Sequence, residues 1–226
     1  MSEFKVAVPI PNHSDWPALG ASGRQKTAVE RARIGLTWLC VTGLTVSCLV
    51  TGSHWQAAGF TSGTMFVVGI CLALIACAGR IWCSLFIDGF KTQQLISWGP
   101  YSICRNPLYL FSAIGAIGVA LGSCTFALPV VAMIFFAIYY PLVIRAEEAR
   151  LTLIHGEQFR EYCQRVPAFF PAFRLPETPE TYEVRTRVFV KSLLEATWFV
   201  WATILVHLLY ELHQRTSLLP EWFRIY

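Results

Sequence analysis

Apolar residues along this chain are gathered into runs, and polar residues are gathered into the segments between them. A helix needs roughly 20 mostly apolar residues to cross the hydrocarbon layer of a membrane. A window of that size finds about four or five candidates, so we expect an all-α, multispan transmembrane helical bundle of about five spans. The runs are Ile34–Val50, Gly63–Phe86, Leu108–Leu121, Phe126–Ile144 and Val188–Leu209.

The third and fourth runs are separated by only a few residues. At 1.5 Å per residue, Leu108–Leu121 would be about 21 Å long, which is too short to cross a bilayer without tilt or local thinning. Gly122-Ser123-Cys124 then turns the chain into the fourth run. We therefore predict that these two helices form a tight hairpin.

The polar segments divide the chain into four parts. Residues 1–30 are predicted to be a mobile tail, and residues 31–87 hold the first two transmembrane helices. Residues 88–171 form a core made of a loop, the helical hairpin and an amphipathic helix. Residues 172–226 supply a linker, the last transmembrane helix and a C-terminal tail.

Composition and charge agree with a membrane protein. The chain has 226 residues, of which 55% are hydrophobic and 14% are charged. Arg24, Lys26, Arg31 and Arg33 precede the first run, and Thr51–Ser62 after it contains no Lys or Arg. The positive-inside rule therefore predicts a cytosolic N-terminus. The net charge of +4 is small and lies beside apolar segments, so we expect contact with a lipid bilayer and not with nucleic acid.

The cysteines and histidines give no metal signature. Eight cysteines are present, but no CxxC pair occurs and the five histidines lack metal-ligand spacing. We expect the cysteines to be small packing residues and expect no metal site.

A loop becomes a helix at Arg105-Asn106-Pro107-Leu108. Asn106 is a favourable residue for the helix N-cap, and Pro107 suits the first helical position. The unpaired backbone N–H groups of such a helix start can hold an anion, for example the carboxylate of an amino-acid-like cofactor. Arg105 would add a bidentate charged clamp.

Two adjacent carboxylates follow the fourth run. Read as one helix, with a possible break at Gly156 left aside, residues 146–166 place their apolar side chains within an arc of about 140°, and Glu147 and Glu148 fall inside that arc. Carboxylates turned toward the protein or the membrane are costly unless a cation meets them. A sulfonium, an amino group or Arg105 could be that cation. The apolar residues of the arc are Leu151, Ile154, Phe159, Tyr162 and Val166.

Simpler interpretations of these charges stay open. Glu147 and Glu148 could pair with Arg145 and Arg150 on a solvated face. Lys191 and Glu195, four residues apart, could form an interfacial ion pair, although Glu195 could instead contact a substrate head group. Arg80, in the last turns of the second run, could extend to the membrane interface or face the bundle.

Both regions resemble motifs of a known family. Residues 99–109, Gly-Pro-Tyr-Ser-Ile-Cys-Arg-Asn-Pro-Leu-Tyr, are similar to "GPYxxxRHPxY". Glu147-Glu148, followed by Leu151, Gly156, Tyr162, Val166 and Pro171, is similar to "EExxL…G…Y…V…P". Both motifs belong to the isoprenylcysteine carboxyl methyltransferase and phospholipid methyltransferase superfamily of integral membrane enzymes. The resemblance covers roughly residues 80–171, in the family's order and spacing.

The resemblance implies an S-adenosyl-L-methionine-dependent methyltransferase with a cytosolic cofactor pocket, into which a lipophilic acceptor enters from the bilayer. The chemistry of methyl transfer makes Arg105 and Glu148 the expected catalytic residues: Arg105 could orient an acceptor carboxylate or hold the cofactor, and Glu148 could be the base for an amine acceptor. Asn106 stands where most members have His, and because Asn does not titrate near neutral pH we assign no general base there. Carried over by position, the cofactor-binding residues are Tyr101, Arg105, Asn106, Pro107, Tyr109, Glu147 and Glu148.

Several functions remain in view. Isoprenylcysteine carboxyl O-methylation is the nearest named activity, and phospholipid N-methylation, for which Glu148 could be the base, is the close alternative. An NADPH-dependent membrane sterol reductase and a non-catalytic membrane scaffold are further alternatives. The acceptor, the oligomeric state and the membrane, either a bacterial inner membrane or the endoplasmic reticulum, are not specified by the residues.

Overall fold

The computed structural model describes residues 51–53, 59–88, 95–182, 184, 186–215 and 223–225. The chain divides into two compact units, Met1–Thr37 and Trp38–Tyr226, and every described residue belongs to the second. The predicted tail at residues 1–30 and the first predicted span, Ile34–Val50, therefore lie outside the described residues.

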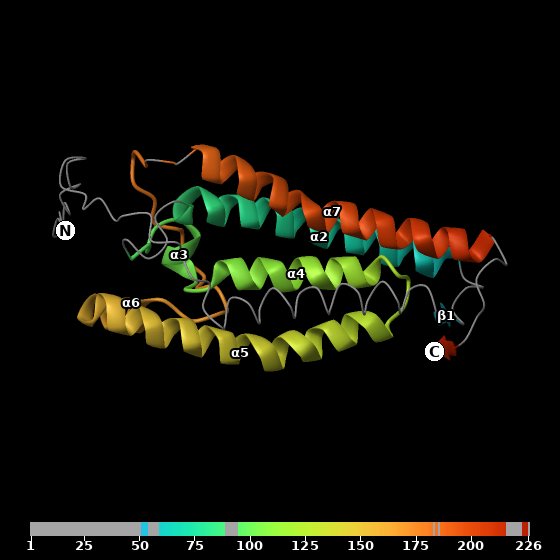
Figure 1. Cartoon of the computed structure of the whole chain (residues 1–226), viewed down its shortest axis with the longest axis horizontal. Coiled ribbons are helices and arrows are strands. Elements are labelled where there is room, and N and C mark those ends of the chain that lie inside the picture. Colours follow the sequence, from blue (N-terminus) through green and yellow to red (C-terminus); the bar gives the residue numbers. More distant parts are fainter. Residues whose placement is uncertain are drawn as a thin grey trace, which may run out of the picture. The chain divides into compact units, whose positions relative to one another are not determined.

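Four helices form the described part of the bundle: α2 (Gly59–Ile87), α4 (Pro107–Leu121), α5 (Ala127–His155) and α7 (Thr186–Arg215). The short α4 packs against each of the other three, and α2 also packs along α7 (Figure 1). As predicted, α4 and α5 form a hairpin through a tight turn at residues 122–126.

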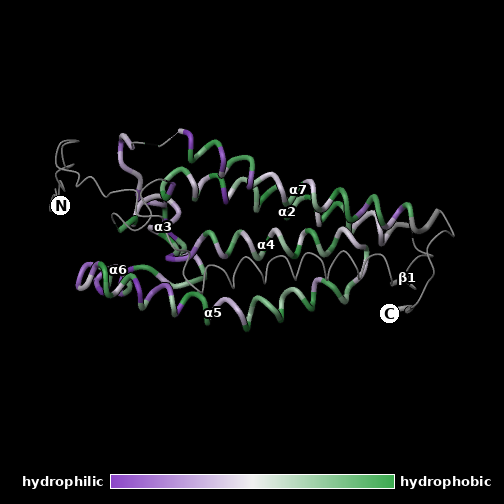
Figure 2. The backbone as a smooth tube through the Cα atoms, in the orientation of Figure 1, coloured by the Kyte–Doolittle hydropathy of each residue, from purple (hydrophilic) through white to green (hydrophobic). Residues whose placement is uncertain are grey.

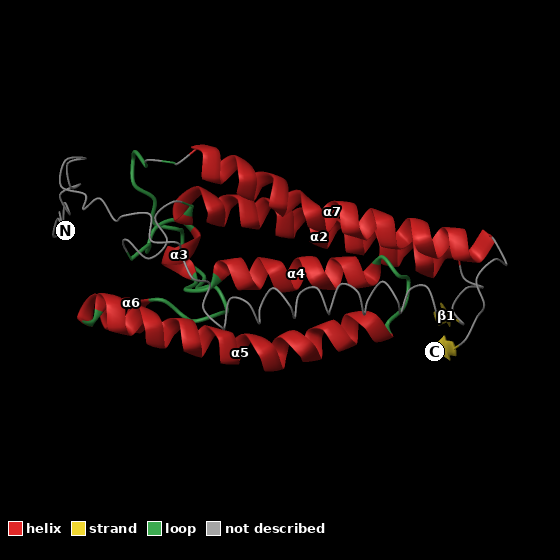
Figure 3. Cartoon of the chain, viewed as in Figure 1, coloured by secondary structure: helices red, strands yellow, loops and turns green. Residues whose placement is uncertain are grey.

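Shorter elements lie at the two ends of these helices. Helices α3 (Pro100–Ile103) and α6 (Glu157–Arg165) lie at the end where the longer described loops gather (Figure 3). A strand pair, β1 (Thr51–Ser53) and β2 (Phe223–Ile225), is parallel and was not predicted by the apolar pattern. The rest of the described secondary structure is helical, as expected.

The outer surface of the helices is apolar, as a lipid-facing surface requires. Thr61–Ile87, Ala127–His155 and Thr186–Leu212 are long and apolar enough to cross a membrane, and Pro107–Leu121 is a shorter apolar helix. Hydrophobic residues follow their middle parts, and hydrophilic residues gather toward α3 and α6 (Figure 2). The chain is therefore a membrane helical bundle. Exposed apolar side chains include Val67, Leu74, Ile138, Leu142, Trp201 and Leu208.

One predicted helix is divided differently from our expectation. The fourth span does not end at Ile144, because α5 continues without a break to His155. The helix considered over residues 146–166 is interrupted at Gly156, the residue at which a break was possible, and the φ of Gly156, 53°, lies in the left-handed region that favours glycine. The amphipathic segment therefore consists of the last turns of α5 followed by the separate helix α6.

Helices α2 and α4 approach each other closely where both carry glycine. A Cβ atom added to Gly69 would lie 2.8 Å from the carbonyl oxygen of Gly118, and one added to Gly118 would lie 2.7 Å from that of Gly69. Small residues allow this approach in membrane bundles, where packing takes the place of the hydrophobic effect between helices.

We predict that Gly69→Ala lowers the free energy of unfolding by about 1–3 kcal/mol, because the new methyl group meets backbone that cannot move away. Gly63→Ala is the matched control in the same helix, since a Cβ atom there has no neighbour within 4 Å. Unfolding of the purified protein in detergent measures both. Equal stability of the two variants would contradict the close packing of α2 and α4.

Candidate functional site

The start of α4 is fixed by its sequence, as expected. Pro107 is the first helical residue and is fully buried, and Asn106 occupies the N-cap position. The expected side-chain cap is absent, however, because Asn106 Nδ2 instead donates a hydrogen bond of 3.0 Å to the carbonyl of Ala168. Asn106 thus ties the helix start to the segment after α6.

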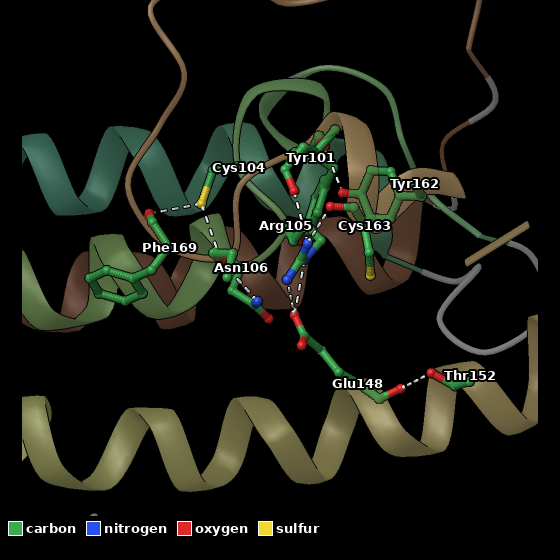
Figure 4. Close-up of polar contacts among 11 residues, drawn as sticks. Tyr101, Cys104, Arg105, Asn106, Glu148, Thr152, Tyr162, Cys163 and Phe169 are labelled. Carbon is green, nitrogen blue, oxygen red and sulfur yellow. Dashed lines mark hydrogen bonds and ion pairs between the residues drawn. The ribbon is translucent and has the colours of Figure 1, made fainter. Parts of the chain in front are cut away.

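Arg105 joins three segments that are distant in sequence. Its Nε and Nη2 both lie 2.9 Å from Oε1 of Glu148 on α5. Its Nη1 donates to the carbonyls of Cys163 and Val166, at 2.8 and 2.9 Å. Those carbonyls belong to the C-terminal end of α6, where helix carbonyls lack intrahelical partners and carry partial negative charge. Figure 4 shows Arg105 held between α5 and the end of α6.

The neighbouring carboxylate has a different partner. The hydroxyl of Tyr109, one turn into α4, donates a 2.8 Å hydrogen bond to Oε2 of Glu147. Both carboxylates therefore face the start of α4, and the expectation that Arg105 could be their cation is confirmed for Glu148. Arg145 and Arg150 are exposed and form no ion pair with either carboxylate in the described part of the chain.

Two motif residues serve the packing of this region. Tyr101 is buried in an apolar cluster with Cys83, Phe86 and Ile96, while its carbonyl accepts a 2.6 Å hydrogen bond from Tyr162. Among the described residues its hydroxyl has no hydrogen-bond partner, and burial raises its pKa well above the ordinary value. The structure thus brings Arg105, Tyr109, Glu147 and Glu148 together and places Tyr101 and Pro107 in the surrounding core.

The segment after α6 encloses the motif, and sequence reasoning missed it. The N–H groups of Arg105 and Ala172 donate to the carbonyls of Pro167 and Ile103, at 2.9 and 2.8 Å. Arg174 donates to the carbonyl of Ser102. Backbone groups make most of these contacts, so they cannot be predicted from the residue types. The prolines of this segment indicate only that it is not helical.

Cys104 belongs to this enclosed region. Its Sγ lies 3.0 Å from the carbonyl oxygen of Phe169. Burial raises the pKa of the Cys104 thiol from 9.0 to about 11, although the Asn106 backbone and the charge of Arg105 act in the opposite direction. The thiol is therefore a packed, protonated group at neutral pH.

Comparison with known proteins supports the family resemblance of the two motifs. A sequence model of the family described as phospholipid methyltransferase matches residues 57–158. Protein-S-isoprenylcysteine O-methyltransferase B of Arabidopsis thaliana is 34% identical over 52% of this chain and 61% of its own. The chain belongs to this membrane methyltransferase superfamily.

Two further relatives match this chain over most of its length. The nickel-cobalt-cadmium resistance protein NccN of Alcaligenes xylosoxydans xylosoxydans is 35% identical, covering 91% of this chain and 95% of its own. The cobalt-zinc-cadmium resistance protein CzcN of Cupriavidus metallidurans is 34% identical, covering 87% and 88%. No solved structure matches significantly.

The superfamily match includes all four clustered side chains. Residues 57–158 contain α2, the motif at residues 99–109, the α4–α5 hairpin and both carboxylates. The segment that supplies the carbonyls of residues 163–172 lies beyond the matched range. The acidic and basic side chains are thus within the family pattern, whereas the backbone groups that fix Arg105 lie partly outside it.

We predict that Arg105→Lys lowers the free energy of unfolding by about 2 kcal/mol, because Lys keeps the charge but cannot serve Glu148 and two carbonyls at once. Arg160→Lys is the control, since its ion pair with Glu157 is exposed and such pairs contribute little. Denaturant unfolding in detergent measures both. Equal losses in the two variants would contradict the three-way contact of Arg105.

We also predict that Cys104 resists alkylation at pH 8 in the folded protein and reacts in the SDS-unfolded chain. The raised pKa means that folding favours the neutral thiol. Its contribution to stability is complete below pH 9.0 and is lost as the pH rises through about 11. Mass spectrometry after iodoacetamide treatment reads the modification. Rapid reaction of folded protein at pH 8 would argue against a buried, protonated thiol.

Proposed function

We propose that this chain is an S-adenosyl-L-methionine-dependent methyltransferase that acts on a lipophilic acceptor in its membrane. One observation carries the proposal: the two motifs of the superfamily meet in space, with Arg105 on Glu148 and Tyr109 on Glu147. They do so at the end of an apolar bundle where polar loops gather, so a polar cofactor and a membrane-soluble acceptor could reach the same place.

The available oxygens of the carboxylates fit the cofactor. Glu147 Oε1 and Glu148 Oε2 accept no hydrogen bond from the described residues, and both side chains are partly exposed. They could accept from the amino group of S-adenosylmethionine and stabilise its sulfonium charge, while Asn106 would bind a polar edge. When bound, this cofactor supplies a methyl group activated by the positive sulfur.

The residues of the chain would mainly align the reactants and exclude water. Transfer to a carboxylate oxygen breaks the methyl–sulfur bond, forms a methyl–oxygen bond and releases no proton, so no general base is required. An amine acceptor would release a proton. Glu148 already forms an ion pair with Arg105, whereas the partner of Glu147 is a neutral hydroxyl. We therefore infer that Glu147 is the better candidate to accept this proton.

Carboxyl O-methylation of a prenylcysteine-type acceptor is the leading form of this proposal. Phospholipid N-methylation is the alternative, supported by the description of the matching family. The resistance names of two relatives add a biological setting, because a methylated membrane component could serve cells under metal stress. Membranes from cells grown with and without cadmium are therefore both suitable sources of acceptor.

We expect membranes carrying this chain to transfer labelled methyl from S-adenosylmethionine into organic-soluble product. Glu147→Gln should lower the rate by roughly 100-fold, because it removes charge beside the proposed cofactor site. Glu157→Gln on α6 is the control, since Glu157 is exposed and outside the cluster. Base-labile label would indicate a methyl ester, and base-stable label a methylated amine.

Two results together would overturn the proposal. The first is absence of label with prenylcysteine, phospholipid and either membrane extract. The second is absence of S-adenosylmethionine binding by the purified chain. That pair of results would favour the reductase or scaffold alternatives.

A further inference from the structure

A second basic side chain lies deeper in the bundle, on α2. The Nη1 of Arg80 donates a 2.6 Å hydrogen bond to Oγ of Ser112 on α4. Its guanidinium carbon lies 5.6 Å from the ring centroid of Phe199 on α7. Arg80 therefore faces the interior of the bundle, between three apolar helices, and does not extend along the outer surface.

The charge of Arg80 is not balanced by the described residues around it. Its contacts are a hydroxyl and an aromatic ring, and its Nε is buried without a hydrogen-bond partner. None of the ion pairs in the described ranges includes it. Arginine stays protonated in proteins, and a charged side chain at membrane depth is energetically costly unless an opposite charge meets it. Such a residue is expected to meet an anion during function.

Arg80 lies next to the proposed methyl-transfer site. Tyr109 and Ser112 are three residues apart on α4, so they share a face, and the ring of Tyr109 packs 5.1 Å from that of Tyr140 on α5. The Arg80–Ser112 pair is therefore separated from the Tyr109–Glu147 pair by about one helical turn, on the side of the membrane interior.

The unused donors of Arg80 define the chemistry of a ligand. Nη1 is engaged by Ser112, whose own hydroxyl donates to the carbonyl of Leu108 at 2.7 Å. The guanidinium edge formed by Nε and Nη2 presents two parallel N–H donors, which match two oxygens of a carboxylate or phosphate. A neutral head group would leave the buried Nε and the charge uncompensated.

We propose that Arg80 binds the anionic head group of the lipophilic acceptor, a lipid-borne carboxylate or phosphate that enters from the bilayer. This inference rests on the proposed function, because only a methyltransferase has a methyl acceptor. The binding of the anion by Arg80 does not itself require methyl transfer. It assigns opposite charges to the two ends of the site: Glu147 and Glu148 would face the cationic cofactor, and Arg80 would face the anionic acceptor.

Binding to the full chain in nanodiscs tests this without any turnover. We expect N-acetyl-S-farnesylcysteine to bind at least about tenfold more tightly than its carboxamide, which has the same shape but no charge. Phosphatidic acid against diacylglycerol is the corresponding phosphate pair. A preference within one pair identifies the anion. No preference within either pair in the unmodified protein would overturn the proposal.

Variants locate the preference. Arg80→Gln should abolish it, Arg80→Lys should retain part of it because one charge remains without the second parallel donor, and Arg160→Gln should leave it unchanged. A full preference in Arg80→Gln would overturn the proposal. Should Arg80→Gln fail to fold, a full preference in Arg80→Lys would overturn it instead.

Methyl-transfer measurements on the same preparations separate the two proposals. Transfer without a charge preference would support the enzyme and refute the Arg80 site. A charge preference without transfer would support the Arg80 site, and together with absence of S-adenosylmethionine binding it would refute the enzyme.

Discussion

The contact of Arg105 with Glu148 and with the end of α6 is the interaction on which the site depends. It joins the start of α4 both to the last turns of α5 and to the end of α6, whereas Tyr109 reaches only Glu147 on α5 and Asn106 reaches only Ala168 after α6. Arg105 and Glu148 are 14% and 24% exposed, so the pair is shielded from solvent but not sealed from it. A buried guanidinium without these acceptors would be strongly unfavourable, so helix start, carboxylate and carbonyls stabilise one another.

This arrangement also changes the role that sequence suggested for Arg105. A clamp for a ligand needs unused donors, yet four of the five N–H donors of Arg105 are engaged within the protein. Arg105 therefore acts first as a positioning residue for Glu148. The groups with unpaired donors or acceptors are Glu147 on the polar side and Arg80 on the apolar side, and both reach α4, where Tyr109 donates to Glu147 and Ser112 accepts from Arg80.

Sequence reasoning predicted the features that one residue type determines. Long apolar runs predicted the membrane helices, Pro107 predicted the start of α4, and the placement of Glu148 among apolar residues pointed to Arg105 as one possible partner. Sequence reasoning did not predict Tyr109 as the partner of Glu147. It missed contacts made by backbone carbonyls, such as that of Ala168 with Asn106, because every residue has a carbonyl. It named Gly156 as a possible break but could not decide it, since hydrophobic spacing alone continues through that residue.

The unbroken course of α5 has a mechanical consequence. Its 29 residues span roughly 44 Å, which exceeds the hydrocarbon thickness of about 30 Å, and the same continuous helix, with Pro141 inside it, carries lipid-facing Ile138 and both carboxylates. A bilayer that becomes thinner or thicker changes the tilt of such a helix. The distance between Glu148 and Arg105 would then depend on the lipid composition around the protein. Bilayer thickness would in that way change the geometry of the site at the membrane surface.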